Sequence, residues 1–189
     1  LGVNTTTTLT NARTFTLYGS TLTLSGPLTG SYAITKTGAG LLVLAGNNTY
    51  TGTTYVYQGT LRLANPSGLG SNSATTYVYQ GGTVDLYGQT TSKPFANITG
   101  QGVNGQGALI NTAGVGPANA ATLFSAISGG TFTVGGTGDI ITSDIQNSAV
   151  VTKIGSGTLT LNGANTYTGA TIINAGTLAT GAGALATTS

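Results

Sequence analysis

The sequence predicts an all-β fold, a right-handed parallel β-helix (β-solenoid) of about eight to nine rungs. Three observations support this prediction. Thr accounts for 39 of the 189 residues, Gly for 32 and Asn for 14, and Thr favours strands whereas Gly and Asn favour tight turns. Apolar side chains alternate with polar ones, which is the period of a strand. Segments also recur at fixed spacings, which is typical of solenoids.

The longest repeat predicts how the chain is organised. Segment 35–61 aligns without a gap on segment 152–178, at an offset of 117 residues, with 16 identities in 27 positions. Agreement of that extent predicts one structural unit used twice. We therefore expect a single β-solenoid over 1–189, with one full unit at 1–117 and a partial second unit at 118–189.

A shorter period lies inside this unit. The sequence Thr-Thr-Tyr-Val-Tyr-Gln-Gly at 53–59 recurs at 75–81. We interpret this spacing as one rung. Rungs of about 22 residues, stacked at the strand spacing of about 4.8 Å, predict a rod about 40 Å long.

The alternation within a rung assigns the inward side chains. Leu42 and Leu44 of the first copy are again Leu in the second copy, while their neighbours Leu41 and Val43 become Thr. Positions that keep Leu are expected to point into the core, because successive side chains of a strand face opposite sides. Glycines of the repeat are expected at the corners, in conformations that residues with a Cβ avoid.

The positions that both copies share form the predicted structural motif. They are Gly38, Gly40, Leu42, Leu44, Gly46, Asn48, Tyr50 and Gly52 in the first copy, and Gly155, Gly157, Leu159, Leu161, Gly163, Asn165, Tyr167 and Gly169 in the second. Asn in turns commonly satisfies backbone groups, so we favour a structural role for the two asparagines over ligand contact. Lys36 and Lys153 are also shared, and a structural or solvated role is sufficient for them.

Composition excludes several classes of function. The chain has no Cys or His and only 8 charged residues, 5 Lys+Arg and 3 Asp+Glu. It therefore lacks disulfides, thiol nucleophiles, imidazole bases and the usual ligands of zinc, haem and iron–sulfur clusters. No cluster of Lys and Arg is available for nucleic acid, and the longest aliphatic run, 41–45, is too short to span a membrane as a helix. We expect no enzyme activity, no metal and no cofactor.

Four tyrosines form a candidate contact surface. Tyr55 and Tyr57 recur one rung later as Tyr77 and Tyr79, which predicts two aromatic columns. A structural ladder is the favoured interpretation, because stacked identical side chains stabilise cross-β arrangements without a ligand. Contact with glycans through these four rings is the alternative.

The few charged residues have structural explanations. Arg62 and Asp85 occupy equivalent positions of adjacent rungs, which predicts a cross-rung ion pair that contributes about 0–1 kcal/mol if it is exposed. Asp139 and Asp144 have opposite strand parity, so catalysis by paired carboxylates is not expected. The surrounding sequence also lacks the glycine and aspartate spacing of calcium-binding rolls.

Segment 35–52, Thr-Lys-Thr-Gly-Ala-Gly-Leu-Leu-Val-Leu-Ala-Gly-Asn-Asn-Thr-Tyr-Thr-Gly, resembles the autotransporter-associated β-strand repeat, also called the passenger-associated transport repeat. The second copy resembles it more closely, through Gly-Thr-Leu-Thr-Leu-Asn-Gly-Ala-Asn-Thr-Tyr-Thr-Gly at 157–169 and Asn-Ala-Gly-Thr-Leu at 174–178. The first copy departs from the pattern at 55–58, where Tyr-Val-Tyr-Gln replaces small aliphatic and Asn-Ala residues.

The resemblance implies a passenger domain of a bacterial type V autotransporter, extracellular or at the cell surface outside the outer membrane. In that family the repeat is structural, is associated with export and folding, and carries no catalytic residues. It implies a β-helical stalk segment whose partners are further repeats of the same protein. Two alternatives remain: an extracellular filament subunit that associates end to end through unpaired strand edges, and an adhesin or glycan-binding module.

Overall fold

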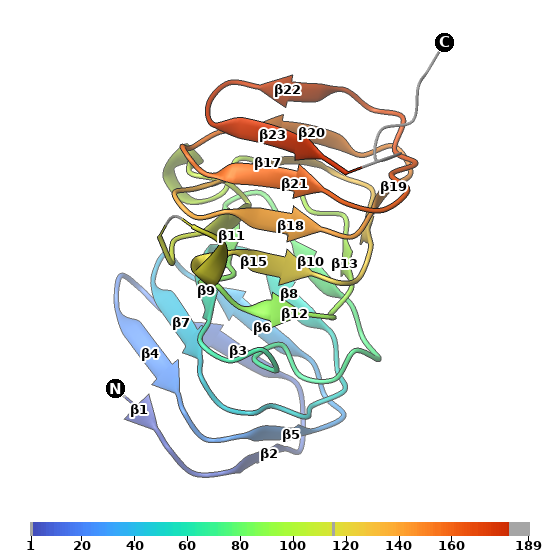
Figure 1. Cartoon of the computed structure of the whole chain (residues 1–189). Coiled ribbons are helices and arrows are strands. Elements are labelled where there is room, and N and C mark those ends of the chain that lie inside the picture. Colours follow the sequence, from blue (N-terminus) through green and yellow to red (C-terminus); the bar gives the residue numbers. More distant parts are fainter. Residues whose placement is uncertain (1, 115, 182–189) are drawn as a thin grey trace.

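Parallel strands stack in rungs along one axis in the computed structural model, which describes residues 2–114 and 116–181 (Figure 1). Every pairing between its strands is parallel. Among the described residues the only helices are two short 3-10 turns, η1 (Val103–Gly105) and η2 (Pro117–Asn119). The predicted β-solenoid is confirmed, with about nine turns.

Each turn passes through up to three sheets. The first sheet has nine strands, in the order β1 (Gly2–Val3), β4 (Thr21–Leu24), β7 (Leu41–Leu44), β9 (Gly59–Leu63), β11 (Gly82–Asp85), β14 (Leu109–Asn111), β17 (Thr131–Gly136), β20 (Val150–Lys153) and β22 (Thr171–Ile173). The second sheet has seven, in the order β3 (Arg13–Thr16), β6 (Ile34–Thr37), β8 (Thr54–Val56), β10 (Thr76–Val78), β13 (Phe95–Ala96), β16 (Ile127–Ser128) and β19 (Ile145–Gln146). The third position of the rung holds β2 (Thr7–Leu9) and β5 (Leu28–Gly30), and further along β12 (Thr90–Thr91), β15 (Ala121–Leu123), β18 (Ile140–Thr142), β21 (Thr158–Leu161) and β23 (Thr177–Thr180).

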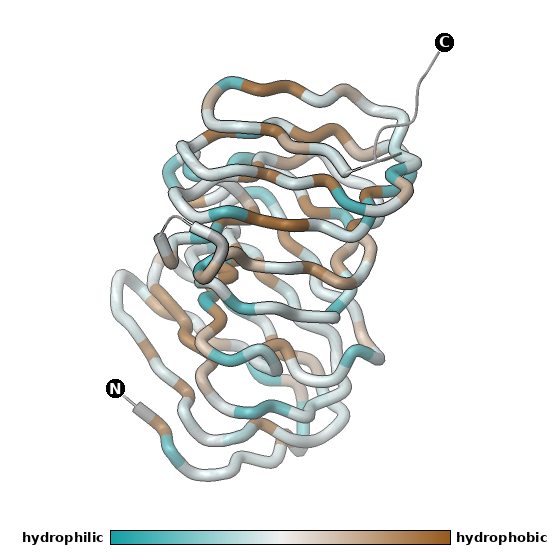
Figure 2. The backbone as a smooth tube through the Cα atoms, in the orientation of Figure 1, coloured by the Kyte–Doolittle hydropathy of each residue, from teal (hydrophilic) through white to brown (hydrophobic). Residues whose placement is uncertain are grey.

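The core consists of columns of aliphatic side chains that run along the axis. In the first sheet Leu42 pairs with Leu61, Leu61 with Val84, and Val84 with Leu109, all of them buried. Figure 2 shows the corresponding hydrophobic segments recurring from rung to rung. Burial of such a side chain stabilises a fold by about 1.5–3 kcal/mol. Because each of these side chains packs against the paired positions in the rungs before and after it, each rung is stabilised mainly by its two neighbours.

The turns are unequal in length. Leu41 pairs with Thr60 in the next rung, whereas the longer turn that begins at Val84 returns to the first sheet only at Leu109. The spacing of the repeated tyrosine segments holds between β8 and β10, where Thr54 pairs with Thr76. The longer turns contain additional surface segments. One of these, residues 100–107, includes η1 and lies beside the first sheet.

The two copies of the long repeat lie on different faces of the solenoid. The first copy begins on the second sheet with β6 and continues on the first sheet with β7, whereas the second copy begins on the first sheet with β20 and continues with β21. Following the pairing from Leu42 through successive rungs of the first sheet leads to Lys153, not to Leu159. The offset of 117 residues between the copies therefore corresponds to five full turns of the solenoid plus the step from one sheet to the next.

Candidate functional site

Both copies of the repeat fill their interior with the same leucines, but their corners differ at one position, since Gly163 has a φ of 75° and the equivalent Gly46 does not have a positive φ. Gly38 and Gly155 have φ angles of 70° and 72°, as expected for corner glycines. The same expectation is wrong for Gly40, Gly46 and Gly52 of the first copy and for Gly157 and Gly169 of the second, none of which has a positive φ. At Gly52 the reason for glycine is close approach instead, because a Cβ would lie 2.1 Å from the carbonyl oxygen of Tyr32 in the preceding rung. Leu42, Leu44, Leu159 and Leu161 are fully buried.

A buried lysine closes a corner in each copy. Lys36 Nζ donates to the carbonyl oxygens of Thr37 at 2.9 Å, Gly38 at 2.5 Å and Gln58 at 3.1 Å. The Lys36 residue is 1% exposed, and burial lowers the pKa of its amine to about 8. The amine therefore binds three carbonyl groups at the corner, of which that of Thr37 also accepts from the Leu17 N–H. These internal bonds support the structural interpretation over the solvated one.

Lys153 makes the same three contacts in the second copy. Its Nζ donates to the carbonyl oxygens of Ile154, Gly155 and Ala175, and burial lowers the pKa of its amine. In both copies a glycine leaves room for the amine. A Cβ on Gly59 would lie 2.7 Å from Lys36 Nζ, and a Cβ on Gly176 would lie 2.6 Å from Lys153 Nζ.

The asparagine and tyrosine of the motif bind neighbouring segments. Asn48 Oδ1 accepts from the Leu28 N–H at 2.8 Å, and its Nδ2 donates to the Gly68 carbonyl at 2.7 Å, so the side chain links the rungs on both sides. Asn165 accepts from the Ile145 N–H at 2.7 Å in the same way. The hydroxyls of Tyr50 and Tyr167 pair with those of Thr54 and Thr171, at 2.7 and 2.5 Å.

Tyr55, Tyr57, Tyr77 and Tyr79 lie together on the outer face of the second sheet, and we call them the tyrosine stack. The ring centroids of Tyr55 and Tyr77 are 5.6 Å apart, and those of Tyr57 and Tyr79 are 4.4 Å apart with an interplanar angle of 7°. Tyr57 is 44% exposed. The stack is a partly exposed aromatic surface that spans two rungs.

Arg62 and Asp85 lie in adjacent strands of the first sheet and form an ion pair. Arg62 Nε lies 2.8 Å from Asp85 Oδ2, and the Arg62 guanidinium lies 4.4 Å from the ring centroid of Tyr87. Asp85 is fully buried and also accepts from the Tyr87 N–H and from the N–H and hydroxyl of Thr112. The carboxylate therefore anchors the segment after β14, in addition to pairing with arginine.

Asp139, Asp144 and Lys93 also have local partners. Asp139 accepts from the Thr158 N–H at 2.8 Å, and Asp144 accepts from the Ser143 hydroxyl at 2.9 Å. Lys93 is buried, donates to the Ser71 carbonyl at 2.7 Å and lies 5.4 Å from the ring centroid of Tyr50. Within 2–114 and 116–181 no three potential metal-ligating side chains gather, and no helix in that part of the chain has the length and hydropathy to cross a membrane.

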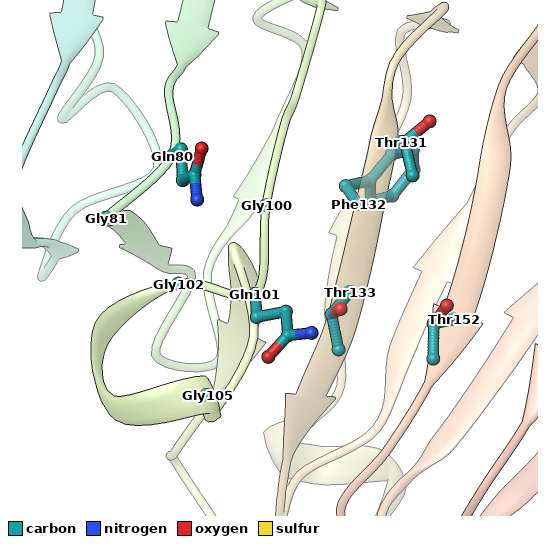
Figure 3. Close-up of a pocket in the computed structure, with 10 residues that line it drawn as sticks. All are labelled: Gln80, Gly81, Gly100, Gln101, Gly102, Gly105, Thr131, Phe132, Thr133 and Thr152. Atoms are coloured by element: carbon teal, nitrogen blue, oxygen red, sulfur yellow. The ribbon is translucent and has the colours of Figure 1, made fainter.

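Two hollows lie at the corner that follows the tyrosine stack. The larger, of about 640 Å³, is lined by Gln80, Gly81, Gly100, Gln101, Gly102, Gly105, Thr131, Phe132, Thr133 and Thr152 (Figure 3). The smaller, of about 210 Å³, is lined by Ala39, Gln58, Gly59, Gly81, Gly102, Val103 and Asn104. Gly81 and Gly102 line both, and we call the two hollows together the corner groove.

Sequence reasoning did not find the corner groove or the deeply buried Lys93. The groove depends on the loop 100–107, which has no counterpart in the shorter sequence period. Its signal in the sequence is Gly-Gln-Gly-Val-Asn-Gly-Gln-Gly at 100–107, a glycine-rich insertion typical of an irregular surface loop. Several of its glycines have positive φ, including Gly102 and Gly105, both at 71°.

Comparison with known families and proteins gives three findings. The family model of the passenger-associated-transport-repeat matches the chain twice, at residues 34–63 and 151–179. The chain is 35% identical over 186 residues to the adhesin BmaC autotransporter of Brucella suis biovar 1 (strain 1330). That alignment covers 90% of this chain and 5% of the relative, so the chain spans a small part of the relative's length. No solved structure matches the chain significantly.

Proposed function

Because the chain carries two passenger-associated transport repeats of bacterial autotransporters, we propose that it is a β-helical stalk segment of a surface-exposed passenger. In this role it lies outside the outer membrane, and its work is mechanical. The observation that best supports this proposal is the first sheet, whose nine strands follow one another without interruption along the described chain. Such a column extends a passenger by about 4.8 Å for every rung.

We further propose that folding of the segment assists its export. Each rung pairs with the rung before it, and cross-rung bonds such as those of Asn48 and Lys36 form only when the next rung is in place. A solenoid gains free energy rung by rung through nearest-neighbour contacts. Rungs that fold outside the membrane would thereby oppose backward movement of the chain.

Surface display of a destabilised variant tests this proposal. The chain, with an epitope tag at its N-terminus, is fused before an autotransporter translocator, and tag accessibility is measured on intact cells. We expect Gly59→Ala to lower the displayed fraction well below that of the matched variant Gly19→Ala, whose added Cβ meets no atom within 4 Å. Equal display of the two variants, with Gly59→Ala less stable in solution, would reject a role of folding in export.

The expected partners are further turns of the same protein. Within the described residues β22 pairs only with β20, and its Ile172 and Ile173 are about half exposed. An unpaired parallel edge supports pairing with another rung. End-to-end association of separate chains is the alternative, and sedimentation velocity over a concentration series separates them: filaments require size to grow with concentration.

A second candidate function is ligand binding, as an adhesin module. The observation that favours it is the partly exposed tyrosine stack, which lies where the first copy departs from the repeat pattern. The relative is named an adhesin, and it is many times longer than this chain. Binding of the isolated chain to oligosaccharides tests this function.

A further inference from the structure

We propose that the corner groove and the adjoining tyrosine stack bind a neutral oligosaccharide, an inference that rests on the second candidate function. The two tyrosines at the end of the stack, Tyr57 and Tyr79, are each followed by a glutamine that lines the groove. Gln58 follows Tyr57 and lines the smaller hollow, and Gln80 follows Tyr79 and lines the larger one. The Gly82 N–H donates to the Tyr79 carbonyl at 2.8 Å, so the chain turns the corner directly after the stack.

The lining of the larger hollow suits a ligand rich in hydroxyl groups. Figure 3 shows the Gln101 side chain extending toward Thr133, with Thr152 on the neighbouring strand. Amide and hydroxyl side chains both donate and accept hydrogen bonds, as sugar hydroxyls require. A volume of about 640 Å³ lies within the range of about 300–1,000 Å³ that is typical of small-molecule sites.

The tyrosine stack supplies the complementary apolar surface. Tyrosine rings present an apolar body with a polar hydroxyl and are favoured at surfaces that contact ligands of mixed polarity. The pyranose ring of a sugar has an apolar C–H face and a polar edge of hydroxyls. An oligosaccharide along the corner would therefore place ring faces against Tyr57 or Tyr79 and hydroxyls against Gln80 and Gln101.

Charge decides which class of glycan fits. None of the described residues that line the two hollows is charged. The buried amine of Lys36 already donates to three carbonyl groups, one of them that of Gln58. The buried amine of Lys153, which follows the lining residue Thr152, also donates to three carbonyl groups. An anionic glycan or a nucleic acid would find no counter-charge, so the site favours a neutral ligand.

Direct titration of the purified 189-residue chain tests the inference. The probes are maltoheptaose, cellohexaose and mannohexaose, with heparin as the anionic comparison. The chain has 9 Tyr and no Trp, so its intrinsic emission reports on tyrosines, and calorimetry gives the affinity independently. We expect saturable binding of at least one neutral probe together with a change in tyrosine emission. Binding of no neutral probe, or of heparin alone, would overturn the proposal.

Two double variants locate the site. We expect Tyr57→Thr with Tyr79→Thr, and separately Gln80→Ala with Gln101→Ala, each to weaken binding about tenfold or more. The control Tyr18→Thr removes a tyrosine that is 84% exposed and lies outside the stack, and it should bind like the original chain. Thr already stands in the preceding rung of the same sheet, at Thr35 opposite Tyr55.

Circular dichroism and urea midpoints of the variants separate the two proposals. Unchanged folding with lost binding supports the site and leaves the stalk function intact. Unchanged folding with unchanged binding overturns the site. If a tyrosine variant unfolds, the glutamine variant decides, because exposed Gln80 and Gln101 lie outside the core.

Discussion

Arg62 and Asp85 stand opposite each other in adjacent strands of the first sheet, with Nε and Oδ2 at 2.8 Å. The sequence alignment predicts their meeting, and gives the pair about 0–1 kcal/mol for the case in which it is exposed. In the structure the Asp85 carboxylate is fully buried and accepts from four donors, two of which belong to Thr112. A buried carboxylate surrounded by donors contributes more than a surface ion pair.

We expect Asp85→Asn to lower the free energy of unfolding by about 2 kcal/mol, the scale of hydrogen bonds to a charged group. The amide nitrogen of Asn would face N–H or O–H donors at whichever oxygen position it takes. The urea midpoint measures the effect. Asp144→Asn is the control, since Asp144 is only partly buried, and a loss as large there would show that any Asp→Asn change has this cost.

Gly59→Ala should be far more harmful than Gly19→Ala. Both residues have nearly the same φ, 74° and 72°, so both variants incur the cost of an L-residue in the left-handed region, about 1–2 kcal/mol. A Cβ on Gly59 would also lie 2.2 Å from the Gly38 carbonyl oxygen. We expect at least about 2 kcal/mol of additional destabilisation from this clash.

Thermal and urea denaturation of the two variants provide the measurement. Similar midpoints for the two variants would mean that the rung containing Gly38 shifts freely to accept the added Cβ. Close packing at the corner of Lys36 would then not restrict substitution of Gly59.

The general fold could be predicted because a strand period and a repeated segment are visible in the chain itself. Leu42 and Leu159 share a place in the alignment, and both are buried in strands. The face on which each copy lies could not be predicted in this way. It depends on the summed lengths of the intervening turns, and because these lengths differ from turn to turn, the second copy moves by one face.

The candidate site, like the fold, could be predicted from the sequence only in part. The neighbouring positions of Tyr57 and Tyr79 follow from the recurrence of their segment one rung later. The corner groove arises from the loop 100–107, whose path is set by tertiary contacts such as the bond from the Val103 N–H to the Thr83 hydroxyl at 2.8 Å. Local patterns in a glycine-rich loop carry little information on such contacts.

Asn48 and Asn47 offer a comparison between adjacent residues. Asn48 is buried and bridges the rungs before and after it, while Asn47 is exposed. We expect Asn48→Ala to lower the free energy of unfolding by about 2 kcal/mol, since two buried backbone groups lose their partners. Asn47→Ala should change it by less than about 0.5 kcal/mol. Equal urea midpoints for the two variants would contradict the bridging role.

The buried lysines predict an unusual dependence of stability on pH. Burial lowers the pKa of Lys36 and of Lys93 to about 8 from an ordinary value of 10.5, and it lowers that of Lys153 as well. Between about pH 8 and pH 10 the unfolded chain therefore holds more protons than the folded chain. Stability rises with pH wherever that is true.

Urea midpoints at pH 7, 8, 9 and 9.5 measure this effect, and we expect them to increase from pH 8 upward. Above pH 10 the trend should weaken, because burial raises the pKa of Tyr50 and only the unfolded chain then loses that proton. Lys36→Met should reduce the increase by removing one of the three groups. A flat or falling profile between pH 8 and 9.5 would mean that the carbonyl bonds of Lys36, at 2.5 to 3.1 Å, hold its ammonium charged despite burial.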